Sequence, residues 1–273
     1  MRALADAIAV HELAEAARRG DALPDLERAF ARRPACGPGR REQHRGIGGG
    51  PVEIPFPTLT NLRGRYRADL GITLVGPDVD AWADQSGIGN DLSAPAAGAR
   101  PLYVASGFNG SPYPYLELDG TAERLTRTVM SWGGVTTSYS LAFIMQVVTA
   151  SATDILFQYA GSYPYGPGAA GGQLSMNDNG AVSTSTTAIT TPKLIAFTKG
   201  GGSQTVYVGE TQEDDDANAT AGEADGGSIS IGAQSSGANF FNVRIAELIL
   251  MRSKLTAAER TALYAYARAR YGV

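Results

Sequence analysis

The first residues of this chain that could do chemistry form a cluster of side-chain oxygens. In the stretch VDAWADQSGIGNDLSAPAAGARPLY (79–103), Asp84, Asn90 and Asp91 follow a tryptophan, and Asp119 lies in a later LDG turn. Oxygen ligands of this kind suit Ca²⁺, which takes about six to eight of them, although the spacing is not that of an EF-hand loop. The alternative is a tight turn in which Asp84 accepts backbone N–H bonds beside glycines that are free to take positive φ. Calcium is therefore the only cofactor that the sequence suggests, and a purely structural turn is its alternative.

A pair of carboxylates is the second candidate. Glu117 and Asp119 in YLELDG alternate with two leucines, so both acids belong to one face of a strand, with Cα atoms about 7 Å apart. Glycan hydrolases use two carboxylates about 5–9 Å apart. A third acid, Glu123, lies one position too far along the chain to be the third carboxylate of such a motif, and Gly120 interrupts the strand. The alternative is a solvated acid followed by an Asp-Gly turn, and we predict no catalytic residue.

Tyrosines beside glycine and proline are the third candidate. Tyr163 and Tyr165 in GSYPYGPG stand in an expected loop, and Tyr113 and Tyr115 in GSPYPYLE, just before and at the start of the strand expected over 115–119, could add to them. Aromatic rings on loops can stack on sugar rings, so these four are the candidate carbohydrate contacts; the alternative is packing on the sheet edge. The acidic run EDDD (213–216) is expected to be a solvated hairpin loop, with a weak cation site as the alternative.

Histidine and cysteine limit the possible chemistry further. His11, Cys36 and His44 all precede the region of β-strand pattern, which contains no imidazole and no thiol. Ser-His and Cys-His nucleophilic chemistry and His-ligated zinc are excluded from that region, unless the N-terminal segment folds back over it. A single cysteine cannot form an intramolecular disulfide, so the fold does not depend on an oxidising compartment.

Charge and hydropathy exclude two classes of partner. The chain has 273 residues and a net charge of −4, with about +2 on residues 1–50 and −6 on residues 51–273. No dense basic stripe marks a nucleic-acid surface. No apolar run of about 18 residues spans a membrane, and acids from Asp6 onward interrupt any secretory signal. If the protein acts outside its cell, we expect it to leave by lysis, on a particle or through a dedicated machine.

The elements that must position these residues divide the chain in two. Residues 2–19 and 24–32 have helical patterns, and 35–51 have the Gly, Pro and Arg content of a linker. We predict an arm over 1–50 that is either a flexible leader or a segment that anchors the protein to a partner. Its apolar anchoring residues are Leu4, Ile8, Leu13 and Phe30.

From about residue 63 the apolar pattern has a period of two, and residues 51–273 are predicted to form one domain. The expected strands are 63–70, 79–84, 115–119, 124–130, 139–148, 154–160, 192–199, 204–210, 227–233 and 240–252. Those at 139–148 and 242–251 are apolar enough to be central strands buried on both faces. About ten strands with hairpin-length connections predict a mainly β fold, an antiparallel sandwich or jelly roll.

Two local features complete this picture. Strict alternation over 79–84 places Val79 and Ala81 on one face and Trp82 on the other, where Trp82 fills the core or the rim of the sheet. Residues 255–272 read as a closing helix, with Thr256 and Glu259 spaced as a capping box.

The order of these motifs resembles a known class of domain. A YRAD strand is followed by WADQSGIGNDL, RPLY, FNGSP and LDG, and the chain ends with IAELIL, LTAAER and a helix that closes on YG. This sequence of motifs over 62–273 is similar to the laminin-G/concanavalin A-like jelly rolls of bacteriophage virion proteins and bacterial surface proteins. The resemblance implies the fold; the fold itself serves lectins, which often bind calcium on such loops, as well as glycan hydrolases and structural parts.

Together these features predict a non-enzymatic phage virion protein that is displayed on the particle surface. The arm over 1–50 would bind other virion proteins of the capsid or tail, and the jelly roll would be a decoration, fibre or adhesion module, homo-oligomeric in the assembly, that contacts host-surface glycans. The alternatives are a free bacterial carbohydrate-binding module and, third, a glycan hydrolase that uses Glu117 and Asp119.

Overall fold

The computed structural model of this chain describes residues 54–135, 137–149, 153–159, 163–169, 172–178, 181–217 and 226–273, and for 163–169, 178 and 181 the backbone alone. The helices predicted over 2–19 and 24–32, the linker over 35–51 and the anchoring residues Leu4, Ile8, Leu13 and Phe30 lie outside these residues and stay predictions. The description that follows concerns the unit Pro51–Val273.

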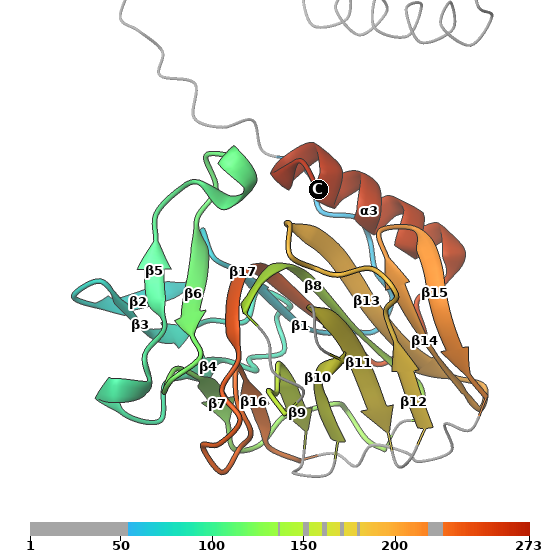
Figure 1. Cartoon of the computed structure of the whole chain (residues 1–273), viewed down its shortest axis with the longest axis horizontal. Helices are drawn as coiled ribbons and strands as arrows, with labels where there is room; N and C mark the ends of the chain where they lie inside the picture. The colour runs from blue at the N-terminus through green and yellow to red at the C-terminus, as the bar shows by residue number, and fades with distance from the viewer. Residues whose placement is uncertain are drawn as a thin grey trace, which may run out of the picture. The chain divides into compact units, whose positions relative to one another are not determined.

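Two antiparallel sheets form this unit (Figure 1). The first sheet is built around β17, which pairs with β8 along one edge and with both β6 and β1 along the other. Its strands are, in spatial order, β5 (Leu102–Val104), β6 (Tyr115–Asp119) followed along the same edge by β1 (Leu62–Arg67), β17 (Asn242–Met251), β8 (Tyr139–Thr149), β13 (Lys193–Gly200), β14 (Ser203–Val208) and β15 (Thr211–Asp216).

The second sheet faces the first. Its strands are β4 (Leu92–Ser93), β7 (Leu125–Arg127), β16 (Ile229–Ile231), β9 (Phe157–Tyr159), β10 (Tyr163–Ala169), β11 (Gln173–Asp178) and β12 (Ala181–Thr184). Strand β3 (Asp78–Trp82) pairs with β2 (Ile72–Val75), with β4 and with β5, so it links the two sheets at one side. The predicted antiparallel sandwich is confirmed.

The main core lies between the sheets, as the sequence pattern predicted. Along β8, alternate residues such as Leu141, Phe143 and Met145 enter this core, while Ala142 and Ile144 face the other way. All five are fully buried, so the prediction that 139–148 is a central strand covered on both faces is confirmed.

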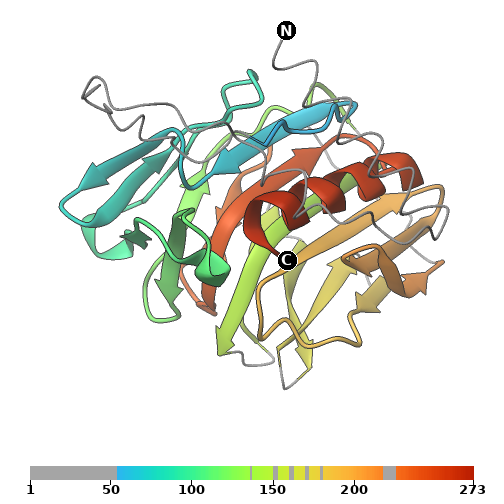
Figure 2. The same cartoon turned by 90° about the horizontal axis from the view of Figure 1, so that it is seen from above.

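A helix covers the outer face of the first sheet. Helix α3 (Ala257–Tyr271) lies across β8, β13 and β17 (Figure 2). Its buried stripe contains Leu263, Tyr266, Ala267 and Tyr271, which pack on the outward residues of those strands. The capping box is present: the Glu259 backbone N–H donates to Thr256 Oγ1, and Glu259 Oε2 accepts from the Thr256 N–H.

Glu259 has a second partner, which makes stability depend on pH. Its Oε1 also accepts from Thr60 N (2.9 Å) and Thr60 Oγ1 (2.7 Å), which attaches the helix to the chain before β1. Partial burial opposes ionisation, but the hydrogen bonds from Thr60 and Thr256 prevail and lower the pKa of Glu259 from 4.5 to about 2. Because the folded-state pKa is the lower one, this stabilisation is complete above about pH 4.5 and is lost as pH falls towards about 2. Urea titrations should show the wild type losing free energy of unfolding across this window, and Glu259→Gln losing less.

The structure differs from the sequence prediction at several segments and on one face. The strands β2, β4, β5, β11 and β12 were not predicted. Residues 163–169 and 211–216, expected as loops from their glycine, proline and acid content, are the strands β10 and β15, because each has neighbours to pair with in its sheet. The expected faces of 79–84 are also wrong. Thr73 pairs with Ala81 and Leu74 with Val79, so Asp80 is an extra residue, and this bulge turns both Val79 and Trp82 into the core.

Candidate functional site

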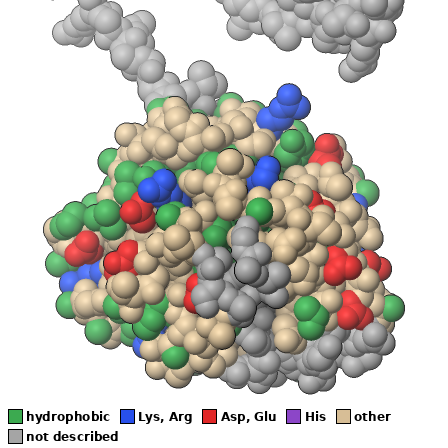
Figure 3. Space-filling model, viewed as in Figure 1, with side chains coloured by type: hydrophobic (Ala, Val, Ile, Leu, Met, Phe, Trp, Pro, Cys, Tyr) green, Lys and Arg blue, Asp and Glu red, His purple; other side chains and the backbone are tan. Residues whose placement is uncertain are grey.

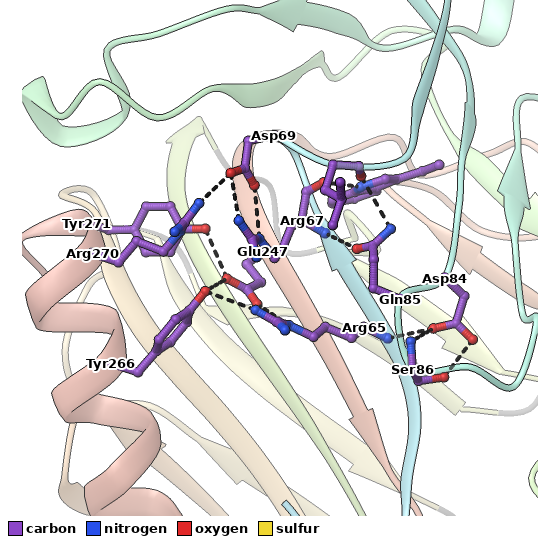
Figure 4. Close-up of polar contacts among 12 residues, drawn as sticks. Arg65, Arg67, Asp69, Asp84, Gln85, Ser86, Glu247, Tyr266, Arg270 and Tyr271 are labelled. Carbon is purple, nitrogen blue, oxygen red and sulfur yellow. Dashed lines mark hydrogen bonds and ion pairs between the residues drawn. The ribbon is translucent and has the colours of Figure 1, made fainter. Parts of the chain in front are cut away.

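The oxygen cluster at 84–91 is a structural turn. Asp84 Oδ1 accepts from Arg65 N (2.9 Å) and Ser86 N (2.8 Å), while its Oδ2 accepts from Ser86 Oγ (2.7 Å) and Asn90 N (3.0 Å). Four donors therefore occupy this one carboxylate, and Figure 4 shows those from Arg65 and Ser86. The predicted structural role of Asp84 is confirmed, and the following Gly87 has φ +86, as the turn requires.

The same turn closes the free edge of β1. Arg65 lies between two bonds to this turn, because its N–H donates to Asp84 and its carbonyl accepts from Gln85 N (2.8 Å). Arg67 N donates to Gln85 Oε1 (2.9 Å), and Trp82 Nε1 donates to the Arg67 carbonyl (2.8 Å). The other edge of β1 pairs with β17. Asp84 and Gln85 thus take the place of a neighbouring strand along this edge, and the Trp82 indole adds one more hydrogen bond to it.

The remaining oxygen ligands proposed for calcium are separated or engaged. Asn90 is buried, and its side chain bonds the Arg63 carbonyl (2.7 Å) and both backbone groups of Ser131. Asp91 Oδ1 accepts from Asp84 N (2.8 Å), and Asp119 accepts within its own turn, from Thr121. Across the described ranges, no three His, Cys, Asp or Glu side chains group closely enough to hold a metal ion.

The structure divides the two acids of the predicted carboxylate pair between different partners. Glu117 forms an ion pair with Arg244 on β17 (2.8 Å), with both side chains about one-third exposed. Asp119 shares a hydrogen bond with Glu123; that bond lowers the pKa of Asp119, whereas burial and the neighbouring carboxylate raise the pKa of Glu123. Glu117 is paired with Arg244, and Asp119 is hydrogen-bonded within its turn. The two acids therefore do not form the acid–nucleophile pair that glycoside hydrolysis uses.

The four candidate tyrosines have different surroundings. Tyr113 is only 8% exposed and packs under α3, with the Arg270 guanidinium 3.9 Å from its ring centroid, so the prediction of a sugar-facing ring is wrong for Tyr113. The Tyr113 ring packs in the apolar cluster between α3 and the first sheet. Tyr115 is half-buried beside Arg244. Tyr163 and Tyr165 lie on β10, and their side chains are outside the described part, so their role stays a prediction.

The acids of β15 hold a sheet edge rather than lying free in a loop. Asp216 accepts from Val182 N (2.9 Å), Asp214 accepts from Thr184 N (2.8 Å), and Glu213 accepts from the N–H groups of Thr186 and Thr187 (2.8 Å each). Carboxylates thus take the place of backbone carbonyls along β12 and satisfy donors that would otherwise be open. Figure 3 shows acidic side chains gathered at the right, over β14 and β15. The expectation of a solvated loop is wrong, because the second sheet ends against these acids.

A buried polar network that the sequence analysis missed joins α3 to the first sheet (Figure 4). Glu247 on β17 is fully buried, and its carboxylate accepts from Arg65 Nε (2.9 Å), Tyr266 OH (2.7 Å) and Tyr271 OH (2.9 Å). Burial, and then the charge of Glu247, raise the pKa of both tyrosines, so both phenols stay protonated donors. The Arg65 guanidinium also stacks on Phe56, 3.5 Å from the ring centroid.

A second carboxylate extends the network. Asp69 bonds both Arg67 (2.8 and 3.0 Å) and Arg270. Although burial raises the pKa of Asp69, the hydrogen bond from Arg67 and the charge of Arg270 lower it overall. Both carboxylates of this network, Glu247 and Asp69, are bonded to arginine or tyrosine side chains of the network. The network therefore orients α3 on the sheet, and neither carboxylate among the described residues is free to react.

A bulge explains why Glu247 reaches this network. On β17, Ile245 pairs with Met145 and Glu247 with Ile144, so Ala246 has no partner on β8. Two successive side chains, Ala246 and Glu247, therefore face α3. Simple alternation in IAELIL would instead place Glu247 in the apolar core, so no signal in the sequence identifies its role.

Comparison with known proteins gives the fold and no family. No family model matches the chain, and no curated protein sequence matches it. The chain is similar to the binding domain of Paraclostridial Mosquitocidal Protein 1, with a TM-score of 0.54 and 15% identity over 75% of this chain and 52% of that chain. It is also similar to domain 4 of AbnA, a GH43 extracellular arabinanase from Geobacillus stearothermophilus, in complex with arabinotriose, with a TM-score of 0.53 and 16% identity over 75% of this chain and 98% of that chain. A third similar structure is Trypanosoma rangeli sialidase in complex with sialic acid, with a TM-score of 0.54 and 14% identity over 81% of this chain and 34% of that chain.

The chain spans about half of the toxin domain and about a third of the sialidase, so the match concerns a domain and not those whole proteins. Identities of 14–16% show the fold alone. They support the predicted concanavalin A-like sandwich. None of the described helices combines the length and the apolar character needed to cross a membrane.

Proposed function

We propose that this chain is a non-enzymatic virion protein whose sandwich binds host-surface glycans. The observation that carries the binding role is the fold itself. The sandwich matches 98% of an arabinanase domain that was solved with arabinotriose, so the likeness covers a whole carbohydrate-bound domain and not a fragment. Two other matches are the binding domain of a mosquitocidal protein and a sialidase in complex with sialic acid.

The state of the acids supports binding over catalysis. A glycosidase needs one carboxyl group that can give a proton and a second that can attack or activate water. In the described sandwich, Glu247 accepts three hydrogen bonds, Asp84 accepts four, and Glu117 is paired with Arg244. These three acids are therefore engaged within the fold, and Asp119, the second acid of the candidate pair, accepts two hydrogen bonds from Thr121 in its own turn.

The virion role rests on the chain's organisation and on its resemblance to phage jelly rolls. Residues 1–50 have a helical pattern and a charge of about +2, unlike the acidic remainder. Display of many copies on a particle would make weak sugar binding effective through avidity. A free bacterial carbohydrate-binding module has the same sandwich, and the two differ in whether residues 1–50 attach to a particle.

A glycan array tests the binding role. The full-length chain should bind a subset of immobilised bacterial-surface and plant oligosaccharides saturably, and incubation with the same oligosaccharides in solution should release no shorter product. Absence of binding to every glycan would overturn the glycan-binding proposal. Release of product that Glu117→Gln abolishes would restore the hydrolase alternative.

Deletion of residues 1–50 tests the virion role. We expect the shortened chain to keep the circular dichroism spectrum of a folded β-sandwich, because the described core lies within 54–273, and to disappear from purified particles. The full-length chain, expressed and purified in the same way, is the control. Equal amounts of both forms on particles would show that the arm does not anchor the protein.

A further inference from the structure

A hollow beside α3 has the shape and the side chains of a small binding site. Its volume is about 480 Å³, and Glu210, Thr261, Tyr264 and Arg268 line it together with two alanines. A smaller hollow of about 130 Å³ adjoins it, shares Tyr264, and includes Lys193 and Gly209. The larger volume lies within the range of about 300–1,000 Å³ that is usual for small-molecule sites.

Two elements from distant parts of the sequence build this hollow. Thr261, Tyr264, Ala265 and Arg268 follow the spacing i, i+3, i+4, i+7, so they share one face of α3, whereas Leu263, Tyr266, Ala267 and Tyr271 form the buried stripe. The turn between β14 and β15 supplies Glu210 from the opposite side. The hollow is therefore formed by tertiary packing of the helix against a hairpin.

A glycine in that turn gives the Tyr264 ring its place. Gly209 has φ +60, and a Cβ atom there would stand 3.2 Å from Tyr264 Cε2. Its N–H donates to the Leu194 carbonyl (2.8 Å), which holds the turn against β13. One edge of the ring thus rests on a rigid backbone, while the ring itself is only half-buried and lines both hollows.

The polar groups around Tyr264 are not used by the fold. Within the described residues, the side chains of Glu210, Arg268 and Lys193 form no hydrogen bond or ion pair. The next acids along β15 differ, because every one from Glu213 to Asp216 accepts a hydrogen bond. An aromatic ring flanked by an unengaged carboxylate and an unengaged guanidinium offers stacking, an acceptor and a donor at one place.

We propose that this hollow is the sugar-binding subsite, in which one pyranose or furanose ring of a glycan stacks on Tyr264. Glu210 accepts from its hydroxyl groups, Arg268 donates to its oxygens, and the next sugar residue lies over the smaller hollow towards Lys193. The assignment rests on the proposed glycan-binding function and moves its site from the tyrosines of β10 to the helix. The combination of ring, acceptor and donor fits a carbohydrate, which presents an apolar face and a rim of hydroxyl groups.

The test uses full-length variants on the same oligosaccharide array. Tyr264→Ala, Glu210→Gln and Arg268→Gln should each weaken binding to the glycans that the wild type captures, by about tenfold or more for Tyr264→Ala. Tyr103→Ala, which removes a half-buried tyrosine on β5, and Glu117→Gln, which removes a half-buried acid, are the matched controls and should bind as the wild type does. Because the fold does not use Glu210 or Arg268, their variants should melt within about a degree or two of the wild type, so they test the site even if Tyr264→Ala unfolds.

The outcomes separate the two proposals. If the wild type binds glycans and the three variants bind equally well, while Tyr163→Ala loses binding, the Tyr264 subsite is wrong and the glycan-binding function stands. If the wild type captures no glycan on the array, the proposed function fails and the subsite fails with it. Selective loss in the Tyr264, Glu210 and Arg268 variants supports both.

Discussion

Glu247→Ala should destabilise the domain by about 3–5 kcal/mol, because it breaks a buried ion pair by removing one partner. Arg65, whose side chain is 12% exposed, would keep its charge without the carboxylate 2.9 Å away. Tyr266 and Tyr271 would keep phenolic protons that must find other acceptors in a buried interface. The loss is measured as the change in the free energy of unfolding in urea.

The surface ion pair between Glu117 on β6 and Arg244 on β17 is the matched control. Glu117→Ala removes an acid from an equally short ion pair, at 2.8 Å, but both side chains there are about one-third exposed. Water replaces the lost partner, so the expected cost is about 0–1 kcal/mol. Equal losses for Glu247→Ala and Glu117→Ala would show that the network under α3 contributes no more than a surface contact. Because Glu247 joins α3 to β1 and β17, its loss should also increase amide exchange in α3.

Asp84→Ala should cost about 2–4 kcal/mol, since one substitution removes the acceptor of four hydrogen bonds. Two of the donors, the N–H groups of Arg65 and Asn90, are part-buried backbone groups that hold the edge of β1 and the end of the turn. Asp119→Ala is the control: it removes an exposed turn acid that accepts two hydrogen bonds from Thr121 and shares one with Glu123, and about 0.5–1 kcal/mol is expected. Urea denaturation of both variants provides the comparison.

The same variant distinguishes the structural turn from a calcium site. If the turn is structural, millimolar Ca²⁺ and EDTA should give the wild type the same melting temperature, because protein N–H groups already occupy the carboxylate. A melting temperature that rises with Ca²⁺ in the wild type and not in Asp84→Ala would establish the calcium interpretation instead. Asn90 would then have to exchange its bonds to Arg63 and Ser131 for the ion.

Several elements follow from the sequence because their cause is local. The strand YLELD alternates apolar and polar residues, and the structure has β6 at Tyr115–Asp119 with both leucines buried. Thr256 and Glu259 satisfy each other's backbone N–H groups across three residues, so the start of α3 is visible in the sequence. Asp84 is similar, since a side chain that bonds N–H groups two and six residues onward is a turn signal.

Other features depend on partners far along the chain, and sequence patterns cannot show them. Tyr113 looks like an exposed turn residue, yet α3 covers it more than 140 residues later and stacks Arg270 on its ring. The acids of 213–216 look solvated, yet β12 presents a row of N–H groups to them. In each case the side chain's environment is set by an element that approaches only when the sandwich closes.

The sequence by itself determined the antiparallel sandwich, its two doubly buried strands, the capped closing helix and a β region without histidine or cysteine, because period, capping and composition are properties of neighbouring residues. Only the tertiary structure decided the bulges at Asp80 and Ala246, which reverse the faces of Trp82 and Glu247. It alone placed Tyr264 opposite Glu210, since a helix and a hairpin about 50 residues apart must pack before the hollow between them exists. A one-residue bulge inverts every side chain beyond it, and its position is fixed by strand pairing rather than by local preference.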